Sequence, residues 1–233
     1  LYNRKHERMA SFRSHSRIYE AFPSTSQMAY CKKPGSDSLY YIFTTEEVRY
    51  IQSEDENSYL RAAVVDMSRD NGYGMLIEDD IQIFKPSSEK IQVVPHCNGT
   101  DYWLVTTEGF TNNIVSFLVD TNGIQLSPIK SDILAPYFSL QNEQSEINIF
   151  PDGFTINSIR GTINRVPPFE VDQYMEFGHF DNSNGRYRPI DTLYVKKYNF
   201  LSFGSYSSTR SPDGRYAYFE MGLHTFVLDI EAL

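Results

Sequence analysis

Aromatic and β-branched residues alternate with polar ones in short runs along most of the chain. Runs such as "YYIFTT" at 40–45 and "YWLVTT" at 102–107 have a period of two, which places alternate side chains on opposite faces of a strand. Pro136 interrupts 131–144, the segment in which a helical period is best sought. The pattern therefore predicts strands along the whole chain and no helix.

Four segments of the chain share one plan. Each has a glycine-containing turn, an aromatic strand, a polar connection and a second strand that ends in aspartate. The turn glycines are Gly35, Gly99, Gly153 and Gly214, spaced 64, 54 and 61 residues apart, and the terminal aspartates are Asp66, Asp120, Asp181 and Asp229. Units of about 40 to 60 residues with several strands each are typical of β-propeller blades.

We therefore predict an all-β fold, a β-propeller segment of about four blades with four antiparallel strands each. The expected single domain covers 1–233, divided into the end of a preceding blade at 1–22, blades at 23–86, 87–135 and 136–198, and a partial blade at 199–233. Closed propellers have about four to eight blades. A segment of a larger ring is favoured, with a complete small ring as the alternative.

The Ser-Pro-Asp-Gly sequence at 211–214 resembles a reactive site, but its residue types are those of a tight turn. Pro-Asp-Gly recurs at 151–153, where Phe150 replaces the serine, so a turn is the better interpretation. The four terminal aspartates allow two interpretations. They could hold calcium, or each carboxylate could accept backbone N–H groups of its own turn, and recurrence at equivalent strand ends favours the turn.

Composition narrows the functional classes. Of the 233 residues 40% are hydrophobic and 15% aromatic, which is enough for a substantial core. The net charge of −9 and the absence of a basic cluster argue against nucleic-acid binding. No run approaches the roughly 18 apolar residues of a membrane helix, so no membrane span is expected. A targeting segment upstream of Leu1 remains open.

No catalytic, metal or cofactor site is predicted. His96 and Cys97 are adjacent, and on a strand adjacent side chains point to opposite faces, so they are not expected to form a nucleophile pair. Cys31 and Cys97 could form a disulfide, but two separate, semi-buried thiols are favoured. Nucleotide-binding glycine loops, paired metal-binding histidines and nucleophile elbows are absent from the sequence.

The acidic stretch "TTEEVRYIQSEDENS" at 44–58 joins two predicted strands and is long for a hairpin connection. Long connections at one end of a rigid scaffold are where recognition residues gather. We therefore predict a partner-contact loop, with the residues Arg49, Tyr50, Glu54, Asp55 and Glu56.

The strings "YYIFT", "VVDMS" and "HCNGTDYWLV", followed by "FPDG", "FGHFDNSNG" and "SPDGRYAYF", carry a family resemblance that covers nearly the whole chain. The chain resembles the N-terminal β-propeller of large secreted and surface proteins of Bacteroidota, which is related to tryptophan-aspartate-repeat and YVTN-type propellers. The resemblance implies a secreted or cell-surface location, associated with the outer membrane, in a lineage with type IX secretion and gliding motility.

These observations favour a non-catalytic binding or display module of an exported bacterial protein. Its expected partner is an envelope or surface protein, or a glycan. The alternative is a propeller hydrolase or lyase that acts on an extracellular polymer or a lactone. That alternative requires charged side chains that converge at the channel mouth with perturbed ionisation.

Overall fold

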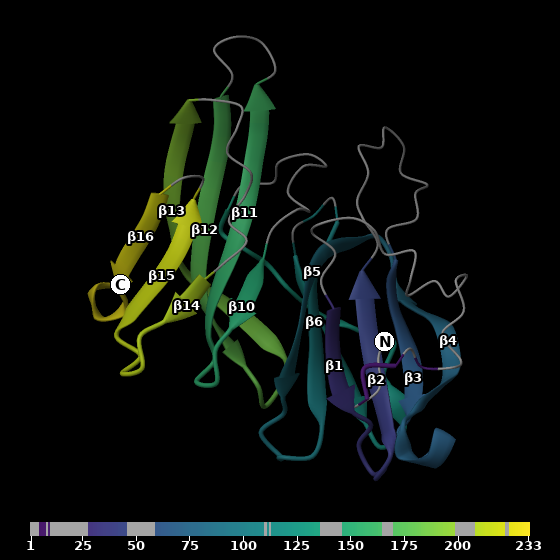
Figure 1. Cartoon of the computed structure of the whole chain (residues 1–233). Coiled ribbons are helices and arrows are strands. Elements are labelled where there is room, and N and C mark those ends of the chain that lie inside the picture. Colours follow the sequence, from purple (N-terminus) through teal and green to yellow (C-terminus); the bar gives the residue numbers. More distant parts are fainter. Residues whose placement is uncertain are drawn as a thin grey trace.

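The computed structural model describes residues 5–7, 9, 28–45, 59–109, 111, 113–135, 146–164, 170–198, 208–221 and 224–233, and these form four antiparallel sheets (Figure 1). The first sheet contains β1 (Met28–Lys32), β2 (Leu39–Thr45), β3 (Leu60–Asp66) and β4 (Met75–Phe84). The second contains β5 (Ser87–Pro95), β6 (Tyr102–Glu108), β7 (Ile114–Asp120), β8 (Gly123–Ile124) and β9 (Ile129–Ser131). The third contains β10 (Ile147–Ile149), β11 (Phe154–Asn164), β12 (Glu170–Asp181) and β13 (Arg186–Tyr198). The fourth contains β14 (Ser208–Arg210), β15 (Tyr216–Met221) and β16 (His224–Asp229).

The first, third and fourth sheets are simple meanders in which the strands pair in chain order, and in the second sheet β8 and β9 both pair with β7. The sheets span 28–84, 87–131, 147–198 and 208–229, so each falls inside one of the ranges expected for a blade. Of the expected end of a preceding blade at 1–22, only residues 5–7 and 9 are described. The described fourth sheet has three strands where the complete blades have four or more.

The period of two along the strands is what allows the sheets to stack. In β2, Phe43 points to the second sheet and is fully buried, whereas Ile42 points to the opposite face, where it contacts Met9 and Val65. Adjacent positions on a strand alternate between faces in this way, so a run such as "YIF" can supply two separate apolar surfaces. Each sheet can therefore pack against one neighbour on either side.

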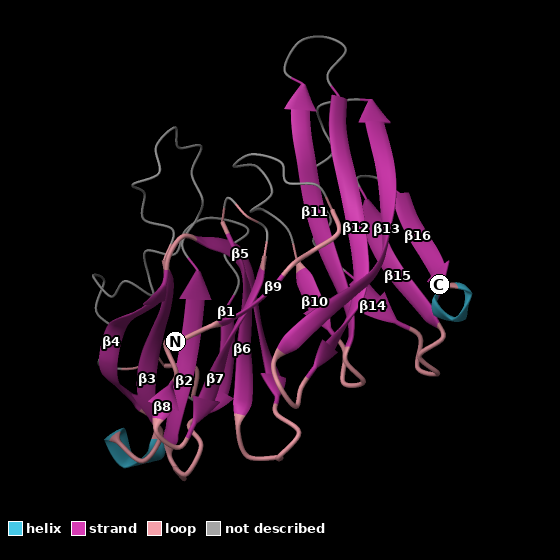
Figure 2. Ribbon diagram, turned by 180° about the vertical axis from the view of Figure 1, so that it is seen from behind, coloured by secondary structure: helices cyan, strands magenta, loops and turns pink. Residues whose placement is uncertain are grey.

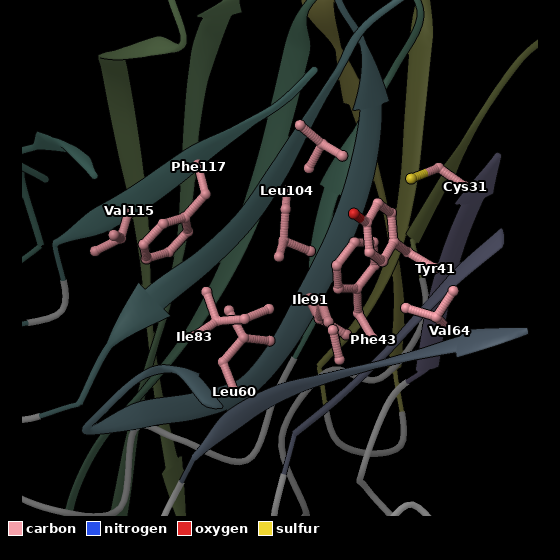
Figure 3. Packing of buried hydrophobic residues seen from close by; sticks show 12 residues of the cluster. Cys31, Tyr41, Phe43, Leu60, Val64, Ile83, Ile91, Leu104, Val115 and Phe117 are labelled. Atoms are coloured by element: carbon pink, nitrogen blue, oxygen red, sulfur yellow. The ribbon is translucent and has the colours of Figure 1, made fainter. Parts of the chain in front are cut away.

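Consecutive sheets pack face to face through apolar clusters. Phe43 and Leu60 of the first sheet meet Leu104 and Phe117 of the second (Figure 3). Further clusters join the second sheet to the third and the third to the fourth; they include Trp103, Val105, Ile147, Phe180, Phe177 and Phe219. The first strand of each sheet is the innermost, and β5 lies beside both β1 and β10. This arrangement confirms the predicted all-β propeller architecture.

The outer strand of the second sheet departs from the regular plan. The chain at 123–131 forms two short strands, β8 and β9, which both pair with β7 and lie on the two sides of Pro128 (Figure 2). Regular pairing with β7 ends at Ile124 and resumes at Ile129, directly after Pro128, which lacks the N–H that a ladder needs.

Helical structure in the described part of the chain is limited to two single 3₁₀ turns, η1 (Asp70–Gly72) and η2 (Ile230–Ala232). The expectation that the chain forms no regular helix is confirmed for these residues. Among them, no helix has the length and apolar character needed to cross a bilayer.

Candidate functional site

The two ends of the sheets differ in how their strands are connected. At one end, which we call the turn end, short hairpins join β1 to β2, β5 to β6, β10 to β11 and β14 to β15, along the lower side of Figure 1. The four repeat glycines lie in these hairpins with φ of +75°, +74°, +89° and +76° for Gly35, Gly99, Gly153 and Gly214. This left-handed region is one that glycine adopts without a Cβ clash.

Ser-Pro-Asp-Gly forms one of these turns. Ser211 Oγ donates to Asp213 Oδ1 over 2.5 Å and accepts the Tyr216 N–H at 2.9 Å, while Asp213 Oδ1 also accepts the Arg215 N–H at 3.1 Å. The hydrogen bond from Ser211 holds the pKa of the Asp213 carboxyl below its usual value. Both side chains are engaged in closing the hairpin, so the interpretation of this sequence as a turn is confirmed.

The four terminal aspartates also act within their own turns. In each, Oδ1 accepts the backbone N–H two residues ahead: Ser68 to Asp66 at 2.9 Å, Asn122 to Asp120 at 2.7 Å, Ser183 to Asp181 at 2.9 Å and Glu231 to Asp229 at 3.2 Å. Hydrogen bonds from Ser68 lower the pKa of Asp66 to about 2. The turn interpretation is confirmed, and no group of three or more His, Cys, Asp or Glu side chains in the described residues could hold a metal ion.

His96 and Cys97 lie next to each other at the turn end, and the expectation that their side chains diverge is wrong. Cys97 Sγ is 3.7 Å from His96 Nδ1, because both residues follow β5 and lie in a turn rather than on a strand. His96 Nδ1 already accepts the Asn98 N–H at 3.0 Å, and its ring stacks on Trp103 with centroids 5.6 Å apart. These contacts give His96 a structural role.

The two cysteines are separate free thiols, as favoured, but they are not both semi-buried. Cys31 is buried in the first apolar cluster and Cys97 is exposed. Burial raises the pKa of the Cys31 thiol to about 12, so this side chain behaves as a small apolar group.

The opposite end, which we call the connection end, is where β2 ends and β3 begins, with Thr45 paired to Leu60. The predicted contact residues Arg49, Tyr50, Glu54, Asp55 and Glu56 belong to the connection between these strands and lie outside the described residues. The antiparallel order places the starts of β5, β10 and β14 at the same end. The segments that connect one sheet to the next therefore begin and end at the connection end.

A layer of buried polar side chains lies beneath the connection end. Every member is less than 9% exposed, and the members come from the first three sheets. This polar layer consists of Thr44, Thr45, Ser87, Ser88, Glu89, Lys90, Thr106, Thr107, Asn157 and Ser158. Buried polar groups of this density are tolerated only when they are hydrogen-bonded.

Lys90 is the charged centre of the polar layer. Its Nζ donates to Asn157 Oδ1 at 2.8 Å and to the Ser158 carbonyl oxygen at 2.5 Å, and thus links β5 to β11 across the junction of the second and third sheets. The Lys90 side chain is among the largest fully buried ones. Because a buried charge is costly unless it is hydrogen-bonded, these contacts fix the two sheets relative to each other.

Hydroxyl groups supply most of the other hydrogen bonds of the polar layer. Thr107 Oγ1 donates to Ser88 Oγ at 2.6 Å, and Thr106 Oγ1 donates to the Lys90 carbonyl oxygen at 2.7 Å. Thr45 Oγ1 donates to the Glu89 carbonyl oxygen at 3.1 Å, which connects the first sheet to the second. The threonine pairs that end "YYIFTT" and "YWLVTT" thus both belong to the polar layer.

Two carboxyl groups of the third sheet have raised pKa values, mainly because they are buried. Glu176 Oε2 accepts the N–H groups of Leu134 and Ala135 at 2.6 and 3.0 Å, and Oε1 accepts the Tyr187 hydroxyl at 2.9 Å. Glu176 therefore holds the chain that follows β9. Glu146, which precedes β10, has a pKa of about 7; it accepts one backbone hydrogen bond, from Ser208, and its Oε2 is buried with no hydrogen-bond partner.

Comparisons with known proteins assign no family. No family model matches the chain, and no curated protein matches it. A solved structure described as "a putative 6-phosphogluconolactonase from Bacteroides uniformis" is similar, with a TM-score of 0.45 and 15% sequence identity. The match covers 87% of this chain and 55% of that chain, so the chain spans about half the length of that structure. At this identity and TM-score the similarity assigns no activity.

The sequence predicted the glycine turns and the terminal aspartates of the turn end, but it did not predict the polar layer. Lys90, Asn157 and Glu146 were not among the predicted site residues. The available indication was the string "SSEK" at 87–90, four polar residues at the start of a strand that continues as the apolar "IQVV". An innermost strand that opens with polar residues indicates a polar layer at that end of the sheets.

Proposed function

We propose that this chain is a non-catalytic binding module whose recognition surface is the connection end. The observation that carries the proposal is the difference between the two ends. At the turn end the aspartates and the serine of the repeat are used in closing turns. At the connection end, residues 46–59 join β2 to β3 and residues 132–146 join β9 to β10, and both connections are longer than any at the turn end. The polar layer lies at the same end, and long connections on a rigid scaffold are the usual place for recognition residues.

The proposed setting is an exported bacterial protein, secreted or held at the cell surface, in the type IX secretion and gliding lineage of Bacteroidota. This part of the proposal rests on the sequence resemblance described above. The proposed partner is an envelope or surface protein or a glycan, and the contact residues are Arg49, Tyr50, Glu54, Asp55 and Glu56. Three acidic side chains in this set favour a partner surface with basic or hydroxyl-rich groups.

A paired charge neutralisation tests this function. The triple variant Glu54→Gln, Asp55→Asn and Glu56→Gln is compared with Asp37→Asn, an exposed carboxylate at the turn end. Binding is measured on a glycan array and to solubilised outer-membrane protein separated into fractions. We expect the triple variant to lose at least about tenfold in affinity for any ligand that the native chain binds, because close charge pairs dominate such contacts. Equal loss in the turn-end variant would contradict the proposal.

A second candidate is a hydrolase or lyase acting on a lactone or an extracellular polymer. One observation favours it: Glu146 has a pKa of about 7, close to the value of an efficient general acid or base at neutral pH. It lies just before β10, at the connection end. Hydrolysis of model lactones that is present in the native chain and lost in Glu146→Gln would favour this activity. Equal rates of lactone hydrolysis by the native chain and Glu146→Gln would contradict a catalytic role for Glu146.

A further inference from the structure

The chain contains four Asn-Gly pairs, and each lies where the chain turns between two strands. The asparagines are Asn71, Asn98, Asn122 and Asn184, followed by Gly72, Gly99, Gly123 and Gly185. Asn-Gly favours tight turns because both residues tolerate a left-handed backbone. Glycine also has no side chain to shield its backbone nitrogen, which can attack the side-chain amide of the preceding asparagine. The reacting groups are the same in all four pairs, so the fold decides which pair reacts.

Two of the asparagine side chains are held by their own turns. Asn98 Oδ1 accepts two backbone N–H groups at 3.1 and 3.0 Å, and its Nδ2 donates to Asp101 Oδ2 at 2.6 Å. Asn184 Oδ1 accepts the Arg186 N–H at 3.0 Å, and its Nδ2 donates to Asp181 Oδ2 at 2.7 Å. An amide fixed in this way cannot turn towards the next backbone nitrogen unless these hydrogen bonds break.

Two of the glycines are shielded by packing. Gly185 is buried, and a Cβ there would lie 2.7 Å from the Trp103 ring. Gly123 is also buried, and it pairs with Asp120 at the start of β8. In the pairs at 122–123 and 184–185 the attacking nitrogen therefore lies within packed structure, and reaction there requires local unfolding.

The pair Asn71 and Gly72 has neither form of protection. Both residues are exposed, a Cβ at Gly72 would meet nothing within 4 Å, and the Asn71 side chain forms no hydrogen bond with any residue that the structure describes. Asp70 and Asn71 have φ of +50° and +54°, a region that residues with a side chain rarely adopt. Backbone hydrogen bonds of 3.0 Å, from Gly72 to Arg69 and from Tyr73 to Asp70, close the turn. We expect this strained, exposed turn to open more easily than the other three.

We propose that Asn71 is a site of spontaneous deamidation. The Gly72 nitrogen attacks Asn71 Cγ and forms a bond with it, while the Cγ–Nδ2 bond breaks. The amide nitrogen leaves as ammonia, and its third proton comes from the Gly72 N–H. Water then opens the resulting succinimide ring at either carbonyl, which leaves aspartate or isoaspartate at position 71.

The products differ from the native turn in charge and in connectivity. Each adds a negative charge next to Asp70, and isoaspartate also lengthens the main chain by the Cβ carbon. The backbone hydrogen bonds from Gly72 and Tyr73 then no longer fit the turn as it is built here. The proposal does not depend on the ligand of the connection end.

Peptide mapping by mass spectrometry tests this assignment on the native chain. The folded chain is incubated in mildly alkaline buffer, in which the Gly72 nitrogen loses its proton more readily, and is then denatured and digested with trypsin. Cleavage after lysine and arginine places Asn71 in peptide 70–90 and Asn184 in peptide 166–186, while Asn98 and Asn122 share peptide 91–130 and are separated by fragmentation. We expect Asn71 to react at least about tenfold faster than Asn98, which corresponds to about 1.4 kcal/mol in the barrier.

Two controls separate the fold from the local sequence. In urea the four pairs should react at similar rates, because the turns are then absent. Asp101→Ala removes the acceptor of the Asn98 amide and should raise the rate at Asn98 towards that of Asn71, and Trp103 fluorescence checks that this variant is folded. An Asn98 rate unchanged by Asp101→Ala would contradict the protective role of these hydrogen bonds. A folded native chain in which any of the other three asparagines reacts as fast as Asn71 would overturn the proposal.

Discussion

Glu146 should make the folded chain less stable as the pH rises towards neutrality, and Glu146→Gln should remove this effect. The carboxyl group is partly buried, and burial raises its pKa from 4.5 to about 7, against one backbone hydrogen bond that lowers it. Burial disfavours the charged form because the interior solvates it poorly. Glutamine keeps an oxygen that can accept the same hydrogen bond, but it has no proton to lose in this range.

The direction follows from the proton count in the two states. The folded pKa lies above the unfolded one, so between about pH 4.5 and 7 the folded chain holds more protons than the unfolded chain. The stabilisation is complete below pH 4.5 and is lost as the pH rises through 7. A shift of this size corresponds to at most about 3 kcal/mol at 1.36 kcal/mol per unit. Partial exposure of the group reduces the expected effect to about 1–2 kcal/mol.

The assay is urea unfolding of the native chain and the variant at pH 5, 6, 7 and 8. The single Trp103 is buried at the junction of the second and third sheets and serves as the fluorescent probe. We expect equal unfolding free energies at pH 5 and a variant that is more stable by about 1–2 kcal/mol at pH 8. Glu220→Gln, on an exposed residue of the fourth sheet, controls for charge removal as such. Parallel curves for the native chain and Glu146→Gln would refute the reasoning.

Three further predictions concern the turns, the polar layer and the thiols. Gly153→Ala should lower the free energy of unfolding in urea by about 2 kcal/mol or more, because a Cβ there would lie 2.4 Å from a backbone oxygen. Gly99→Ala has nothing within 4 Å of the added Cβ and should lower it by only about 1 kcal/mol, because of its positive φ. Lys90→Met should cost about 3 kcal/mol in the same assay, because it leaves buried acceptors unpaired; a loss below about 1 kcal/mol would contradict the role of this side chain. Thiol titration of the native chain should label Cys97 rapidly and Cys31 only after unfolding, and two rapid thiols would show that the buried site is open.

Features that depend on a few adjacent residues were predictable from the sequence. A positive φ at Gly153 and the contact of Asp181 with the N–H two residues ahead are decided within one turn, so their residue types indicate them directly. The alternation of Ile42 and Phe43 likewise assigns the two faces of β2 before any partner is known. The sequence of turns, strands and terminal aspartates was therefore enough to predict the propeller architecture.

Features that join distant parts of the chain were not predictable in the same way. Lys90 meets Ser158 across 68 positions of sequence, and this contact exists only because two sheets stack with a particular register. The prediction that the side chains of His96 and Cys97 diverge was wrong for a more local reason. Strand β5 ends at Pro95, so the two residues lie in the turn directly after it. Strand boundaries and the contacts between neighbouring sheets are determined by packing, which can be inferred only indirectly from a single sequence.

The innermost strands explain how the sheets keep a fixed relation to each other. Apolar faces alone tolerate sliding, because dispersion and hydrophobic contacts have little directionality. Polar contacts between innermost strands do not tolerate it. The Gln92 side chain both donates to the Ile149 carbonyl oxygen at 2.9 Å and accepts the Ile149 N–H at 2.6 Å, and Asn148 donates to the Ser208 carbonyl oxygen at 2.8 Å.

A shift of one residue along either junction would break these bonds and bury their partners unpaired, at about 1–3 kcal/mol for each group. The polar layer adds Lys90 at the same junction, closer to the connection end. The apolar clusters thus supply most of the attraction between sheets, and the side-chain hydrogen bonds of the inner strands select one register. Segments that leave the connection end are thereby anchored at fixed positions, which is the property that a recognition surface on a propeller requires.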